Sequence, residues 1–156
     1  MALGTPFTMI TDEKVIVNEV INSSQVVLFE ERARKIDAYF LKRKMPLAGY
    51  GIKMVHESND NGLDWRLLPA IAIRESTGGK FACHNNPFGW GSCSIKFKNF
   101  DEAIKTVAAH LGGNKTSTTQ YYKNKTTIEK LSRYNSVIPS YTKEIFEFMQ
   151  LIENNR

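Results

Sequence analysis

The chain has 156 residues, of which 42% are apolar and 24% charged, and this balance is typical of one globular domain with its own hydrophobic core. Its net charge of +5 favours an anionic polymer as partner. Nucleic acid is the weaker candidate, because the basic residues form no stripe interleaved with aromatic residues. No apolar run reaches the length of a membrane-spanning helix, and residues 1–6 lack the pattern of a signal peptide.

An N-terminal arm over residues 1–23 is expected to precede the main domain, residues 24–156. The arm has poor helical periodicity, and its valine and isoleucine residues at 15–21 favour a short strand or an extended segment packed on the domain. Ser24 is a suitable N-cap for a helix that continues to about residue 44. The side chains expected to be buried on this helix include Leu28, Ile36 and Phe40.

A short helix over residues 50–59 should bury Ile52 and Val55. Asp64 is a good N-cap for the next helix, which ends near Glu75. The residues that follow, 78–98, are rich in glycine, asparagine and serine and predict an irregular or β-hairpin lobe.

Three further helices are predicted in the C-terminal part. The first begins at Asn99, an N-cap followed by Glu102 in the pattern of a capping box, and stops at two glycines after residue 111. A polar loop over residues 114–126 should lead to helices at 127–134 and 140–154. The last helix should bury Ile145, Phe148, Met149 and Ile152. The whole pattern predicts a mainly α fold of the α+β type with one small irregular or β-hairpin lobe.

Cys83 and Cys93 bracket a stretch rich in turn formers. We favour a disulfide between them over two free thiols, because it would close a short loop and stabilise it by roughly 2–3 kcal/mol. Such a bond implies an oxidising compartment. A zinc site is disfavoured, because only His84 accompanies the two cysteines and no CxxC pair occurs.

Glu75 is the most informative candidate for a functional residue. It shares one helical face with Leu68, Ile71 and Ala72, so a carboxyl group ends an apolar stripe one turn before a glycine-rich stop. Removal from water there would favour the protonated form. A retained proton is what a general acid in glycoside cleavage needs. The alternative is an ordinary glutamate in the last turn of a surface helix.

Three segments, at residues 70–79, 85–91 and 133–141, together resemble the motifs of the lysozyme-like superfamily. They read as a helix ending in Glu-Ser, an Asn-Asn-Pro-Phe-Gly loop, and an Arg-Tyr-Asn-Ser segment before a final helix that carries a tyrosine. The chain is similar in this respect to the bacterial glucosaminidases of autolysins and flagellar wall hydrolases, and to the lytic transglycosylases. The resemblance covers roughly residues 33–153.

The resemblance implies that Glu75 is the catalytic general acid and that Tyr134 lies near the scissile sugar. The substrate-binding residues expected from it and from their neighbours are Ser76, Asn85, Asn86, Phe88, Gly89, Trp90 and Tyr141. Each has an ordinary structural alternative. The asparagines are common in turns, the aromatic rings are common in cores, and the serine can bond locally at a helix end.

One departure from the glucosaminidases concerns the second acid, which they carry in a long segment after the Asn-Asn-x-Phe-Gly loop. Here residues 92–96 hold no carboxylate, and Glu102 is better explained as part of a helix cap. A mechanism with a single acid, as in the lytic transglycosylases, is therefore expected. Glu75 would protonate the glycosidic oxygen and then take a proton from the muramyl 6-hydroxyl. The alternative is assistance by the N-acetyl group, with water as the final acceptor.

The sequence thus predicts a monomeric, secreted or cell-envelope enzyme that cuts the β-1,4 glycan strand of peptidoglycan, without a metal or other cofactor. It leaves open whether the enzyme is an N-acetylglucosaminidase, a muramidase or a lytic transglycosylase. An endo-N-acetylglucosaminidase for chitin-like or N-linked glycans is an alternative within the same fold. An alternative of another class is a catalytically silent glycan-binding or interaction domain.

Overall fold

The computed structural model describes the backbone of residues 11–155, and the side chains of these residues except 11–19 and 22. Within this part the chain forms seven helices and no strand. The mainly α prediction is therefore confirmed. Of the two forms expected for the small lobe at residues 78–98, irregular or β-hairpin, the described residues show the irregular form, with one isolated bridge between Cys83 and Asn86.

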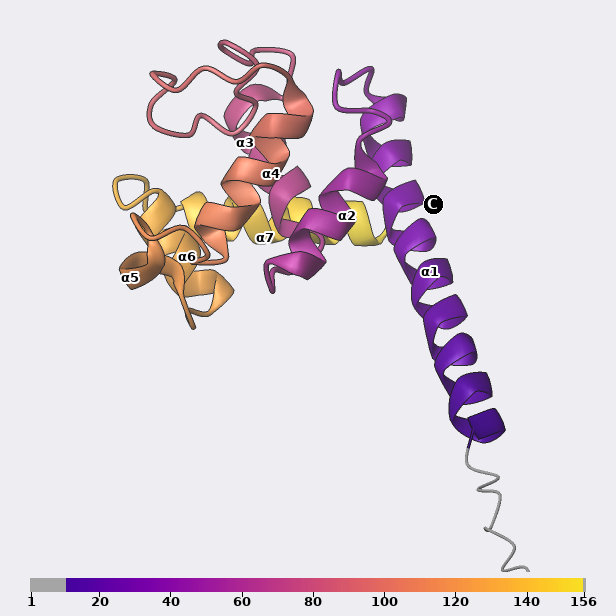
Figure 1. Ribbon diagram of the computed structural model, residues 1–156. Helices are drawn as coiled ribbons and strands as arrows, with labels where there is room; N and C mark the ends of the chain where they lie inside the picture. Colours follow the sequence, from indigo (N-terminus) through magenta and orange to yellow (C-terminus); the bar gives the residue numbers. More distant parts are fainter. Residues whose placement is uncertain (1–10, 156) are drawn as a thin grey trace, which may run out of the picture.

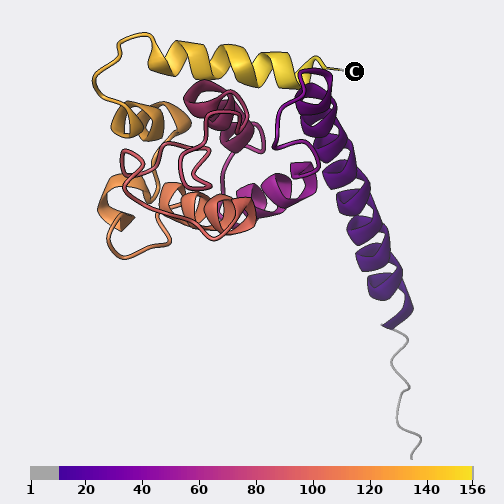
Figure 2. The ribbon, with the colours of Figure 1, turned by 90° about the horizontal axis from the view of Figure 1, so that it is seen from above.

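The first helix, α1 (Thr11–Lys42), is much longer than expected. The strand or extended segment expected at residues 15–21 is wrong, because these residues belong to α1; the first ten residues of the expected arm lie outside the described residues. Ser24 lies inside the helix and is not its cap, since its hydroxyl donates to the carbonyl of Val20 at 2.9 Å. Figures 1 and 2 show the N-terminal half of α1 projecting away from the other helices.

The two halves of α1 differ in burial. Leu28 is 41% exposed, contrary to expectation. Ile36 and Phe40 are fully buried, as predicted, because the C-terminal half packs against α2 (Gly51–Asp60) and α7 (Tyr141–Glu153). Among the described helices, none combines the length and apolarity that crossing a bilayer requires.

The core is built around α3 (Leu67–Ser76), which is apolar on every side until its last turn and packs against α7 and α2. Asp64 does not cap it. The Asp64 carboxylate instead accepts from the backbone N–H of Arg66 at 2.9 Å in a turn before the helix. In α2, Val55 is buried as predicted, but Ile52 is 41% exposed.

The remaining helices follow the sequence pattern closely. In α4 (Phe100–Leu111) the Asn99 side chain accepts from the Glu102 N–H, but Glu102 accepts from Lys98 and so completes no capping box with Asn99. A short helix, α5 (Thr119–Tyr122), interrupts the expected loop. The next helix, α6 (Thr127–Tyr134), has the predicted bounds, and α7 buries three of its four predicted residues, with Phe148 half-buried.

Candidate active site

Glu75 occupies the last turn of α3, and the first turn of α7 lies beside it. The helix ends at Thr77, whose backbone is left-handed with φ 53°. Tyr141, the first residue of α7, donates its hydroxyl to Oε1 of Glu75 at 2.7 Å. The Glu75 residue is half-buried, and this hydrogen bond anchors its carboxyl group at one oxygen.

The second carboxylate oxygen of Glu75 faces the backbone of Gly89. A Cβ atom placed at Gly89 would lie 2.9 Å from Oε2, closer than real Cβ contacts. Gly89 also has φ +62°, a conformation that favours glycine. Both properties favour glycine here, and the short approach places the predicted loop directly against the predicted acid.

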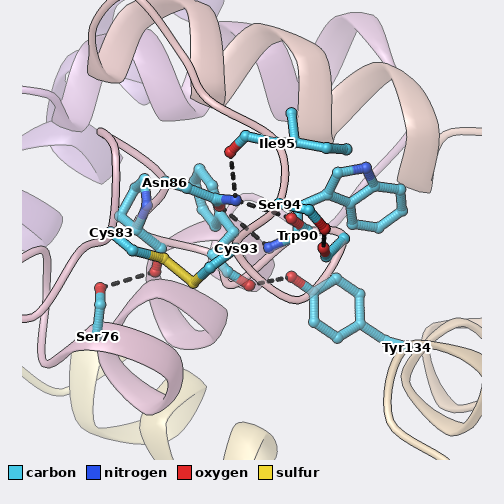
Figure 3. Close-up of a disulfide and its surroundings, with 11 residues drawn as sticks. Ser76, Cys83, Asn86, Trp90, Cys93, Ser94, Ile95 and Tyr134 are labelled. Carbon is cyan, nitrogen blue, oxygen red and sulfur yellow. Dashed lines mark hydrogen bonds between the residues drawn. A yellow bond between two sulfur atoms is a disulfide. The ribbon is translucent and has the colours of Figure 1, made fainter.

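The loop that carries Gly89 is closed by a disulfide between Cys83 and Cys93, whose Cα atoms are 6.0 Å apart (Figure 3). The disulfide prediction is therefore confirmed. Inside the loop, Asn86 is 1% exposed, and its amide donates to the carbonyls of Trp90 (2.8 Å) and Ile95 (3.3 Å). Its Oδ1 accepts from the Trp90 N–H at 3.1 Å. The Asn86 side chain thus replaces regular secondary structure as the support of the loop.

Ser76 connects this loop to α3. It is buried, its hydroxyl donates to the carbonyl of Pro87 at 2.7 Å, and it accepts from the Gly79 N–H at 3.0 Å. Phe88 is fully buried in the core. The burial of Ser76, Asn86 and Phe88 prevents contact with a ligand in this structure, so these residues position the loop.

Tyr134 lies next to Tyr141, and their rings stack with centroids 6.1 Å apart and an interplanar angle of 13°. Its hydroxyl donates to the backbone carbonyl of Phe88, the residue before Gly89. Burial raises the pKa of Tyr134 well above its ordinary value, and the Glu75 carboxylate adds to the effect. Burial is also the largest cause of the raised pKa of Tyr141. The neighbouring Tyr134 hydroxyl and the hydrogen bond to Glu75 raise this pKa further. Both hydroxyls therefore stay protonated and act as donors.

An open pocket of about 420 Å³ lies near the Glu75 carboxyl group, and its volume is within the range of small-ligand sites. Glu75 does not line this pocket, but two residues of the pocket wall, Gly89 and Tyr134, lie close to the Glu75 side chain. The full lining is Gly89, Trp90, Gly91, Ser92, Thr118, Tyr121, Tyr122, Arg133 and Tyr134.

Trp90 is the centre of an aromatic cluster in this pocket. Its ring stacks on His110 with centroids 5.0 Å apart, and it lies 5.6 Å from Tyr134 and 6.2 Å from Tyr122. The partly exposed rings among them, Trp90 and Tyr134, suit stacking against the apolar faces of sugar rings, whereas Tyr122 is buried. Asn85 lies outside the pocket, exposed, and its amide donates to the carbonyls of Phe97 and Lys98.

Several residues of the site were not predicted. The pocket residues of α5 fell in a stretch that reads as a polar loop, where the paired tyrosines at 121 and 122 were the available signal. Glu144 was also missed; it forms an ion pair with Arg74, the neighbour of Glu75, and accepts from the Ser140 hydroxyl. These two partners hold the pKa of Glu144 below its ordinary value, with Ser140 the larger cause.

No family model, curated protein or solved structure matches the chain. Across the described residues, no group of three or more histidine, cysteine or acidic side chains could hold a metal ion. What the described geometry offers chemically is one anchored carboxyl group beside an aromatic-lined pocket, a combination suited to proton transfer on a bound ligand.

Proposed function

We propose that this chain is a lysozyme-like peptidoglycan-cleaving enzyme that cuts the β-1,4 glycan strand with Glu75 as general acid. The observation that carries the proposal is the placement of the Glu75 carboxyl group, held by Tyr141 on one oxygen and adjoining the pocket around Trp90. A sugar stacked in that pocket would bring its glycosidic bond within reach of the acid.

In the proposed reaction Glu75 gives its proton to the glycosidic oxygen, and the bond to the anomeric carbon breaks. The positive charge that develops on the sugar is neutralised in one of two ways. Either Glu75 takes the proton of the muramyl 6-hydroxyl, which closes an anhydro ring, or the N-acetyl group assists and water completes hydrolysis. Tyr141 orients the carboxyl group for both proton transfers.

A single-acid mechanism is favoured by the surroundings of Glu144. This carboxylate lies one turn after Tyr141 on α7, but Arg74 and Ser140 occupy its two oxygens. It is therefore engaged in an ion pair and is unsuited to serve as a free base. We propose a secreted or cell-envelope location and a monomeric protein, and the Cys83–Cys93 bond supports the oxidising location.

The proposal is tested with purified peptidoglycan, wild-type protein, Glu75→Gln and a control variant, Glu147→Gln, which changes an exposed glutamate of α7. Wild type and Glu147→Gln should clear the suspension, and Glu75→Gln should lose at least ~100-fold of the rate, because general acids contribute about 10²–10⁴-fold. Retained activity in Glu75→Gln would overturn the mechanism.

Mass spectrometry of the released fragments assigns the bond. Anhydro ends indicate a lytic transglycosylase, reducing muramic acid a muramidase, and reducing glucosamine a glucosaminidase. Binding to walls with no released fragment would instead indicate a silent glycan-binding domain, and cleavage of chitin-like or N-linked glycans alone would indicate the other endo-N-acetylglucosaminidase class.

A further inference from the structure

Arg133 is the charged residue of the pocket beside Glu75. The other lining residues are glycines, aromatic residues, a serine and a threonine. Burial raises the pKa of Tyr122 and of Tyr134, so these hydroxyls carry no charge near neutral pH. Among the residues that line the pocket, the charge is therefore carried by one guanidinium group, which remains protonated at any physiological pH.

The guanidinium of Arg133 has no acidic partner in the part of the chain that the structure describes. Its central carbon lies 4.1 Å from the centroid of the Tyr121 ring, so the group is held by cation–π stacking and forms no ion pair. By contrast, Arg66 pairs with Asp64 and Arg74 pairs with Glu144. Arg133 is thus positioned on a ring of the pocket and has its donors free.

Stacking leaves the edge of a guanidinium available. The central carbon of the Arg133 group lies over the Tyr121 ring, and a guanidinium presents its five N–H donors in a planar fork. That fork matches the two oxygens of a carboxylate, which it can bind through two parallel charge-assisted hydrogen bonds. A neutral N-acetyl sugar offers no such group.

We propose that Arg133 is a specificity-determining residue that binds a carboxylate of the substrate, so that the pocket takes acidic, muramyl-containing strands in preference to neutral chitin-like strands. This inference rests on the proposed function. The carboxylate has two possible sources on a wall glycan, the lactyl acid of muramic acid in strands without peptides and the acids of attached peptides. In both, the recognised chemistry is a planar carboxylate beside the scissile sugar.

The test compares kcat/KM on three substrates: chito-oligosaccharides, glycan strands freed of peptides by an amidase, and intact peptidoglycan. On an acidic substrate, Arg133→Gln should lower kcat/KM by about 10- to 100-fold, as expected for one charge-assisted pair. On chito-oligosaccharides, the factor by which it lowers kcat/KM should be at least tenfold smaller. Arg133→Lys keeps the charge without the fork and should recover part of the loss. The acidic substrate with the larger loss identifies the source of the carboxylate.

Arg43→Gln is the matched control, because Arg43 also stacks on a tyrosine, Tyr39, at 3.7 Å, but lies outside the pocket. It removes the same charge and should behave as wild type on all three substrates. Equal losses of Arg133→Gln on acidic and neutral strands, or no loss on either, would overturn the inference. So would equal losses in Arg43→Gln, since they would point to net charge alone.

Calorimetric binding separates this inference from the proposed function. Glu75→Gln and the double variant Glu75→Gln with Arg133→Gln are titrated with chitobiose, with the N-acetylated disaccharide of glucosamine and muramic acid, and with the same disaccharide carrying its stem peptide. If no substrate is ever cut but either acidic ligand binds more tightly than chitobiose and only through Arg133, the inference stands and the enzymatic proposal falls. If strands are cut but neither acidic ligand binds more tightly than chitobiose, the enzymatic proposal stands and the inference falls.

Discussion

The hydroxyl of Tyr141 donates to Oε1 of Glu75 across 66 positions of sequence, and this bond joins the start of α7 to the end of α3. The tyrosine that the lysozyme-like resemblance favoured, Tyr134, donates instead to the carbonyl of Phe88. The two tyrosine rings stack on each other. Tyr141 thus holds the carboxyl group, and Tyr134 holds the loop that faces it.

Tyr141→Phe should lower kcat by tenfold or more and change KM little, because the ring stays in place and Glu75 loses the donor that orients it. The free energy of unfolding should fall by about 1 kcal/mol, the typical net contribution of one hydrogen bond. Steady-state kinetics and urea unfolding of the same samples measure both quantities. Unchanged kcat would show that the bond is structural only.

Tyr134→Phe should cost about 1 kcal/mol of stability, one hydrogen bond, because the apolar area is nearly all retained. Turnover should fall by tenfold or more, since the lost bond holds Phe88 and, through it, Gly89 against Glu75. Full turnover in Tyr134→Phe combined with unfolding of Tyr134→Ala would assign this tyrosine to packing alone.

Gly89→Ala should reduce activity by at least about tenfold, because the added Cβ would meet Oε2 of Glu75 and displace the acid. Gly62→Ala is a matched control, since Gly62 has the same φ of +62° but nothing within 4 Å of its Cβ position. Both variants should lose roughly 1–2 kcal/mol from the left-handed backbone. Activity should separate them, and equal activities would show that the close approach is unimportant.

Reduction of the Cys83–Cys93 bond should lower the free energy of unfolding by about 2–3 kcal/mol, as for a short closed loop. It should also lower activity, because the loop between the cysteines carries Gly89 and Trp90. Intact-mass measurement before and after reduction and alkylation detects the bond. Two freely alkylated thiols in the unreduced native protein would contradict it.

The free energy of unfolding should decrease as the pH is lowered below about 6.5, because of His110. Burial lowers its pKa in the folded protein below the ordinary 6.5, and Lys115 adds to the shift. Above about pH 6.5 the imidazole is neutral in both states; as the pH falls further, the unfolded chain takes up the proton first, so the free energy of unfolding decreases until the folded histidine titrates. Urea unfolding over this range should show a shallower decline in His110→Asn than in wild type. Parallel curves would rule out the contribution.

The elements that the sequence predicted well are those whose signals are local. Helix α6 has the expected bounds because Thr126 and Glu129 form a capping box, and α4 ends as expected at Gly112. The arm at residues 15–21 was misjudged because β-branched residues favour strands only when a partner strand exists, and the described chain provides none. Ile52 and Leu28 follow a helical period, yet each is 41% exposed, so the period alone did not predict burial.

The parts of the candidate site that depend on a single short segment of sequence were predictable. Glu75 at the end of an apolar stripe and the disulfide loop both lie where the sequence indicated. The bond from Tyr141 and the opposition of Gly89 to the carboxylate were not predictable, since each depends on how distant segments pack. Arg133 gave no local signal either, because its stacking partner Tyr121 belongs to a helix of only four residues.

The position of Trp90 has an optical consequence. The chain has two tryptophans, and Trp65 lies among Arg32 and Arg66, while Trp90 borders the pocket and stacks on His110. Replacement of Trp65 by phenylalanine would leave a protein whose tryptophan emission comes from the pocket alone. A saccharide that covers the Trp90 ring would then change the emission spectrum directly, so ligand affinity becomes measurable in solution without a label and without turnover.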